Sequence, residues 1–106
     1  MENKADRVQD SSSIVSRREL MLPNAYVAPR TPTEVKLAEI WRKTLTMDRV
    51  GISDDFEELG GDSLLAASMV AEIETVFAIA VPIGSLARAP TIEQLASRID
   101  SLIAKK

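Results

Sequence analysis

Hydrophobic positions recur at helical spacing in three stretches of the chain, and nowhere do they alternate in the two-residue pattern of a strand. The first stretch begins with two helix-start signals: Thr31 and Glu34 form a capping box, and Pro32 takes the first helical position. The residues expected to face inward follow at a spacing of about 3.6: Leu37, Ile40, Trp41 and Leu45. The pattern therefore predicts an amphipathic helix that ends near Leu45.

The second stretch predicts a helix from about Ser63 to Phe77. Its expected buried stripe consists of Leu65, Met69, Ile73, Val76 and Phe77. Three small residues on this helix are expected to permit close approach of another helix: Ala66, Ala67 and Ala71. The connection over residues 46–62 is long for so small a domain, which favours a functional role. Four of its residues are spaced to anchor it on a bundle: Val50, Ile52, Phe56 and Leu59.

The third stretch follows a proline-containing break and a short helical turn expected over about residues 83–88. Thr91 and Gln94 form a second capping box, and Lys105–Lys106 carry suitable charges for a helix C-terminus. The expected inward stripe consists of Ile92, Leu95, Ala96, Ile99, Leu102 and Ile103. Together these elements predict an all-α fold, a small four-helix bundle with three main helices, one short helix and a long loop between the first two.

Residues 1–25 lack sustained periodicity and have mixed charge, which is typical of a flexible leader. We expect this leader to be dispensable for folding and residues 26–106 to form the folded domain. A chain of 106 residues has no room for a second independent core. Its apolar runs fall far short of the ~20 residues of a membrane-spanning helix. The polar N-terminus and the absence of cysteine favour a cytoplasmic protein, and we expect a monomer.

The net charge of −3 hides a strong asymmetry. Between Val50 and Ala87 the chain has seven acidic residues and neither Lys nor Arg. Five of the acids closely precede Ser63: Asp54, Asp55, Glu57, Glu58 and Asp62. Such a surface repels the phosphates of nucleic acids and speeds encounter with basic partners. We therefore expect no nucleic-acid binding.

Ser63 is the residue of greatest chemical interest, but it has no obvious activating group. The chain has no histidine and no cysteine, so no imidazole can take the hydroxyl proton and no thiolate can replace the serine. A carboxylate-pair hydrolase needs a cleft that raises the pKa of only one acid, which so small a helical chain cannot easily build. A calcium loop starting at Asp54 has Phe56 where the second ligand belongs. We expect no catalytic residue and no metal site; Ser63 is either a handle that other enzymes modify or an ordinary residue at a helix start.

The residues around Ser63 resemble a known family. The run DDFEELGGDSLLA at residues 54–66 resembles the prosthetic-group attachment motif of acyl and peptidyl carrier proteins. Two flanks are similar to the nonribosomal-peptide branch of that family: YVAPRTPTE at residues 26–34, and APTI at residues 89–92 followed by Leu95-Ala96. The resemblance covers residues 26–103. One departure is Asp62, because many peptidyl carriers have histidine there, whereas acyl carriers often have aspartate.

The resemblance implies a non-catalytic carrier protein. Ser63 would receive 4′-phosphopantetheine from coenzyme A through a separate phosphopantetheinyl transferase, and the arm would hold an aminoacyl or peptidyl thioester in nonribosomal peptide synthesis. The implied partners are adenylation, condensation, tailoring or thioesterase enzymes. Two alternatives stay open: an acyl carrier of polyketide or fatty-acid type, and an unmodified carrier-like interaction module. Residues 17–23, of the type Arg-Arg-x-Leu-x-x-Pro, are loosely similar to the linker between an adenylation domain and its carrier.

The expected surroundings of Ser63 suit this modification. A helix N-terminus offers unpaired N–H groups and a positive dipole end, which favour a phosphodiester anion. Gly60–Gly61 allows the backbone to turn without Cβ obstruction. Asp62 is expected to cap the helix by accepting from the N–H of Leu64 or Leu65. The candidate partner-recognition residues are Asp62, Leu64, Met69, Ala87 and Arg88.

Overall fold

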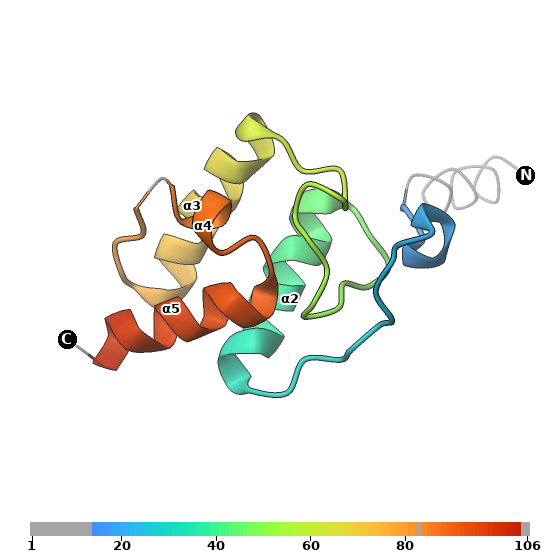
Figure 1. Ribbon diagram of the computed structural model, residues 1–106. Coiled ribbons are helices and arrows are strands. Elements are labelled where there is room, and N and C mark those ends of the chain that lie inside the picture. Colours follow the sequence, from blue (N-terminus) through green and yellow to red (C-terminus); the bar gives the residue numbers. More distant parts are fainter. Residues whose placement is uncertain (1–13, 83, 105–106) are drawn as a thin grey trace, which may run out of the picture.

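The architecture, taken from a computed structural model that describes residues 14–82 and 84–104, is a small helical bundle (Figure 1). Its elements in chain order are the 3₁₀-helix η1 (Arg17–Leu20), α2 (Pro32–Leu45), α3 (Ser63–Phe77), α4 (Ser85–Arg88) and α5 (Ile92–Ala104). The predicted fold class is confirmed: three longer helices, one short helix and a long loop between α2 and α3. Over the described ranges, strand-like pairing is limited to one isolated parallel bridge between Val15 and Met47. None of the helices in those ranges is long and apolar enough to cross a membrane.

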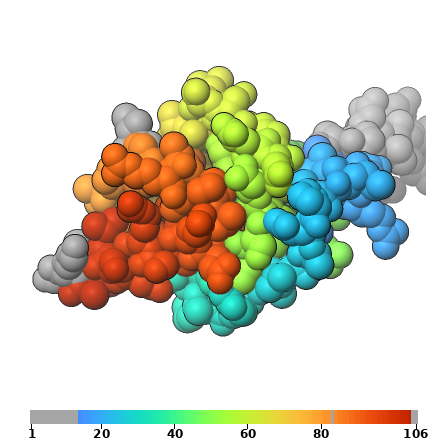
Figure 2. All heavy atoms as spheres, in the orientation of Figure 1, coloured from blue at the N-terminus to red at the C-terminus, as the bar shows by residue number. Residues whose placement is uncertain are grey.

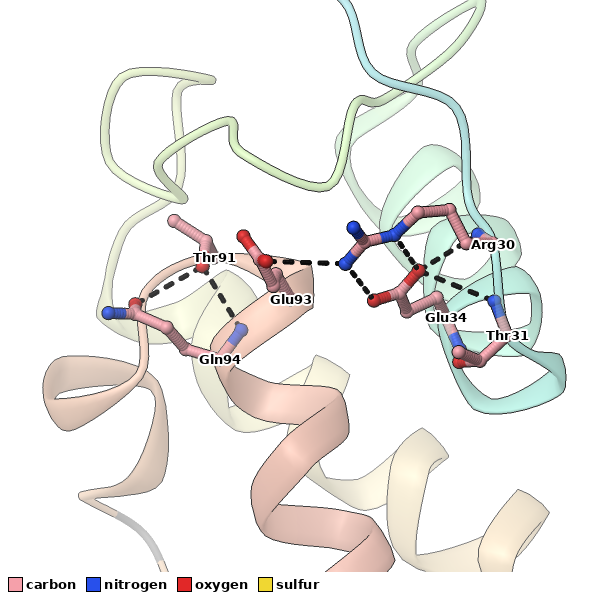
Figure 3. Close-up of polar contacts among 6 residues, drawn as sticks. All are labelled: Arg30, Thr31, Glu34, Thr91, Glu93 and Gln94. Carbon is pink, nitrogen blue, oxygen red and sulfur yellow. Dashed lines mark hydrogen bonds and ion pairs between the residues drawn. The ribbon is translucent and has the colours of Figure 1, made fainter.

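The start of α2 is fixed by the predicted capping box and by Arg30, the residue before the N-cap Thr31. The Thr31 hydroxyl accepts from the N–H of Glu34 at 3.1 Å, and the Glu34 carboxylate accepts from the N–H of Thr31 at 3.4 Å. Arg30 pairs with Glu34 at 3.1 Å and with Glu93 of α5 at 3.2 Å (Figure 3). The hydrogen bond from Arg30 holds the pKa of the buried Glu34 below its usual value, against the opposing effect of burial. Arg30 thereby ties the start of α2 to the start of α5.

The start of α5 uses only half of the predicted capping box. The Thr91 hydroxyl accepts from the N–H of Gln94 at 3.2 Å, as expected. The Gln94 side chain accepts from the same hydroxyl at 3.1 Å instead of reaching back to the backbone (Figure 3). Lys105 and Lys106, expected to favour the C-terminus of this helix, lie outside the described residues.

The core lies between α2, α3 and α5, and α2 packs against both of the others. All four predicted inward residues of α2 are buried, and so are the four predicted loop anchors: Val50, Ile52, Phe56 and Leu59. Two predicted core positions are wrong, because Val76 is 41% exposed and Ile103 is 42% exposed. The buried face of α3 is rotated toward Val70, which leaves Val76 at the edge of the stripe. Ile103 lies in the last turn of α5.

Residues 14–24, which we call the strap, pack against the bundle and differ from the flexible leader expected over residues 1–25. The backbone of Val15 is bonded on both sides: its N–H donates to Thr46 O at 2.7 Å, and its carbonyl accepts from Asp48 N–H at 2.9 Å. Leu20 and Leu22 are partly buried against the core. Figure 2 shows the atoms of this segment in blue against the green atoms of the loop that follows α2. Residues 1–13 of the expected leader lie outside the described residues.

A buried ion pair joins the strap to the loop between α2 and α3. Arg17 meets Asp54 with two hydrogen bonds, Nε to Oδ2 and Nη2 to Oδ1, both 2.6 Å. Asp54 is 1% exposed, and its Oδ2 also accepts from the N–H of Gly51 at 2.8 Å. The hydrogen bond to Asp54 raises the pKa of Arg17. Asp54 is therefore a buried structural residue whose negative charge is balanced by Arg17. The expectation that it belongs to the acidic surface near Ser63 is wrong.

Candidate functional site

Ser63 is the first residue of α3, and its side chain is exposed. Asp62 is the N-cap: its Oδ1 accepts from the N–H of Leu65 at 2.9 Å, which confirms the predicted cap. The first N–H groups of a helix have no partner within the helix, and they lie at its positive dipole end. An anionic group on Ser63 would thus lie beside the amides of the first turn of α3.

The two glycines before Ser63 are required for different reasons. Gly60 has a φ of 97°, in the left-handed region that favours glycine. A Cβ at Gly61 would overlap the ring of Phe56, so this position has no room for a side chain. The Gly61 N–H donates to Phe56 O at 3.0 Å, and the Phe56 N–H donates to Pro90 O at 2.8 Å. The turn that presents Ser63 is therefore braced against the residues that precede α5.

Phe56 supports this turn from the core. Its ring meets Trp41 edge to face, with the ring centroids 5.5 Å apart. Trp41 is fully buried, and its indole N–H has no acceptor in the described part of the chain. The predicted core role of Trp41 is confirmed, and the Phe56 ring lies between this core residue and Gly61 of the turn.

A groove of about 950 Å³ starts beside Ser63 and extends along α3. One wall is a single face of α3: Ser63, Ala66, Ala67, Val70, Ala71 and Glu74. The opposite wall comes from α4 and its flanks: Gly84, Leu86, Ala87 and Pro90. The loop closes one end with Asp55, Phe56, Glu57, Gly61 and Asp62. Ala67 and Ala71 are exposed, so the expectation that they would let another helix pack closely is wrong; they face the groove.

The groove carries carboxylates from Asp55, Glu57, Asp62 and Glu74, and among the residues that the structure describes no Lys or Arg lines it. Asp55 also orders its own loop, because its Oδ1 accepts from the N–H of Glu57 at 2.9 Å. Within the described ranges, no three His, Cys, Asp or Glu residues come together in a way that could hold a metal ion.

The structure separates the candidate partner-recognition residues into two groups. Leu64 is 80% exposed, and Asp62, Ala87 and Arg88 are also at the surface. Asp62 and Ala87 line the groove together with Ser63. Met69 is 0% exposed and belongs to the core, so it is wrong as a partner contact.

Glu74 lines the groove, although the sequence pattern did not single it out as a residue of the site. Its Oε2 accepts from the N–H of Val81 at 2.8 Å, which fixes the segment between α3 and α4. Helical spacing could have indicated it, because positions 63, 67, 70 and 74 fall on one face of a helix. The sequence offered no signal for the bond to Val81, which depends on the path of the chain after α3.

The family profile and the similar proteins that match this chain agree on one family. The family profile described as "Phosphopantetheine attachment site" matches residues 35–99, more than half of the chain. Chondramide synthase CmdD of Chondromyces crocatus is 49% identical over 79 residues, which are 74% of this chain and 2% of that protein. The chain spans less than a tenth of the length of the curated relatives that it matches first.

Two solved structures match over most of their own length. The solution structure of an active-site mutant peptidyl carrier protein is 35% identical, with a TM-score of 0.71 over 74% of this chain and 88% of that chain. A peptidyl carrier protein solved with the phosphopantetheine transferase Sfp and coenzyme A is 37% identical, with a TM-score of 0.69 over 72% of this chain and 99% of that chain. The chain therefore belongs to the phosphopantetheine-attachment family, in its branch of peptidyl carrier domains of nonribosomal peptide synthetases.

Proposed function

We propose that Ser63 holds 4′-phosphopantetheine as a phosphodiester and that the thiol of this arm carries an aminoacyl or peptidyl group as a thioester. The observation that carries the proposal is the place of Ser63: exposed, first in α3, and beside a groove, in a chain of this family. The helix start suits the phosphate, because its N–H groups and dipole favour an anion. Asp62 adds a negative charge nearby, but its Oδ1 is engaged by the N–H of Leu65.

Attachment requires a separate transferase, because the chain contributes no group that can activate the serine. The Ser63 oxygen forms a bond to the phosphorus next to the pantetheine, the pyrophosphate bond of coenzyme A breaks, and adenosine 3′,5′-bisphosphate leaves. The hydroxyl proton passes to a base on the transferase, since this chain has no histidine or cysteine. The chain is then a substrate of its partner enzymes and a carrier between them.

Mass spectrometry tests the attachment. Incubation of the protein with coenzyme A and a broad-specificity phosphopantetheinyl transferase should add the mass of one arm, and peptide fragmentation should place it on Ser63. The absence of any adduct, or an adduct mapped to another serine, would contradict the proposal.

The class of cargo is tested by loading. We expect the arm-bearing protein to accept amino acids from adenylation enzymes supplied with ATP, and then to serve condensation, tailoring or thioesterase enzymes. The competing function is that of a polyketide or fatty-acid carrier, which an acyltransferase would load from malonyl-CoA. Loading by malonyl-CoA alone would refute the peptide assignment.

Partner recognition beside Ser63 is expected to depend on Leu64. A large apolar side chain that is 80% exposed at the edge of the site is a suitable contact for an enzyme that must reach Ser63. Leu64→Asp should lower the rate of modification or loading about tenfold, the effect of losing a contact worth ~1.4 kcal/mol. The circular dichroism spectrum should not change, because the side chain packs against little.

Val35→Asp is the matched control for this substitution. Val35 is also apolar and exposed, but it lies on α2, which contributes nothing to the groove. Equal rates for wild type and Leu64→Asp would place the recognition surface elsewhere.

A further inference from the structure

The groove follows α3 for about the length of a phosphopantetheine arm. Ser63 lies at one end of this face and Glu74 at the other, separated by about three helical turns, or roughly 16 Å at ~1.5 Å per residue. The arm contains a phosphate, a pantoyl group, a β-alanyl group and a cysteamine. The extended arm is about as long as four to five extended amino-acid residues, roughly 15–18 Å. An arm attached to Ser63 can therefore reach Glu74 without leaving the groove.

The lining of the groove suits an arm of mainly apolar and amide character. The wall formed by α3 consists largely of small residues, which leave the groove open, and α4 contributes Leu86 and Ala87 to the opposite wall. Its volume of about 950 Å³ falls within the ~300–1,000 Å³ of typical ligand sites. Because Ala67 and Ala71 are exposed, this surface is not used by the packing of the bundle.

The far end of the groove is acidic and held in place. Glu74 is partly buried, and the bond from the Val81 N–H to its Oε2 fixes the carboxylate while the other oxygen remains able to accept. Within residues 14–82 and 84–104, no basic side chain lines the groove to neutralise this carboxylate. A cationic group at the tip of the arm would meet this carboxylate in a partly desolvated position, where opposite charges attract more strongly than in water.

We propose that Glu74, at the far end of the groove, receives the α-ammonium group of an aminoacyl thioester carried on the arm at Ser63. The proposal rests on the function proposed above. Tethering at Ser63 gives the arm a millimolar effective concentration in the groove, so weak contacts suffice to hold it. A cargo with a free ammonium group is held, whereas a cargo whose nitrogen is acylated, as in a peptidyl chain, lacks the charge and is released more readily.

The test compares two stable cargoes on the full chain. An amide-linked aminoacyl arm and its N-acetylated counterpart are attached at Ser63 through coenzyme A analogues, and the amide spectra of the labelled proteins are recorded by NMR. We expect the aminoacyl form to shift the amides of Ala67, Ala71 and Val81. The ratio of held to free arm should be about two- to fivefold higher than for the N-acetylated form, the range of a partly exposed ion pair.

Glu74→Gln should remove this difference, because the amide oxygen still accepts from the Val81 N–H but the charge is gone. Glu72→Gln is the matched control: it removes an exposed carboxylate from the same helix, outside the groove, and should leave the difference intact. Equal shifts for both cargoes, or an unchanged difference in Glu74→Gln, would overturn the role of Glu74. If that variant does not fold, the two cargoes on the wild-type chain decide alone.

Measurement of the intact mass distinguishes a failure of the proposed function from a failure of this further inference. A protein that gains no arm at Ser63 refutes the proposed function. A protein that carries the arm without any shift in the groove refutes only the role of Glu74.

Discussion

Ser63→Ala is expected to abolish the gain of mass from coenzyme A while leaving the fold unchanged. The substitution removes the oxygen that would be bonded to phosphorus. It leaves the helix start intact, because Asp62 supplies the cap and alanine is the best helix former. Its free energy of unfolding should stay within about 0.5 kcal/mol of wild type, as for an ordinary surface substitution. Intact-mass measurement and thermal melting check the two halves of the expectation.

Ser68→Ala provides the control for this result. Ser68 is an exposed serine of the same helix, one turn and a half further along, and its loss should leave modification complete. An adduct that persists in Ser63→Ala would show that another hydroxyl is used.

Arg17→Ala is expected to destabilise the protein by about 3–5 kcal/mol, because it leaves the buried Asp54 without its counter-charge. This is a large part of the ~5–15 kcal/mol that stabilises a typical domain. Urea unfolding followed by Trp41 fluorescence measures the loss, and Trp41 is the only tryptophan of the chain.

Arg18→Ala is the matched control, since Arg18 is the exposed neighbour of Arg17 and should cost less than about 0.5 kcal/mol. A chain that begins at Asn24 lacks Arg17 and should lose at least as much stability as Arg17→Ala. We therefore propose that the folded unit begins near Ile14, and the dispensability of residues 14–23 expected from the sequence is revised. Equal stability of the shortened and full-length chains would contradict this proposal.

The features predicted correctly from the sequence are those that depend on residues close together along the chain. The starts of α2 and α3 followed from Thr31, Pro32 and Asp62, which act within one turn of a helix. The position of Ser63 at the helix start followed from the same local signals. Helical period alone could not fix the centre of the buried face, and so Val70 was missed and Val76 was misplaced.

The strap and the far end of the groove could not be predicted in this way. Arg17 and Asp54 are 37 positions apart, and each by itself looks like a solvated surface charge. A segment held by one ion pair and a few backbone bonds has no apolar period to detect. Likewise, the placing of Glu74 opposite α4 depends on the course of residues 78–84, which only the fold determines.

The strap also limits how far the carrier can travel from anything joined before it. As a free chain, residues 14–25 would add up to roughly 40 Å of extended length between the bundle and a preceding domain. Held by Arg17 and by the backbone bonds of Val15, residues 14–17 add almost none of that length. The ion pair thus sets the length of the tether as well as the stability of the fold. Its rupture would widen the volume that the tip of the arm can sweep.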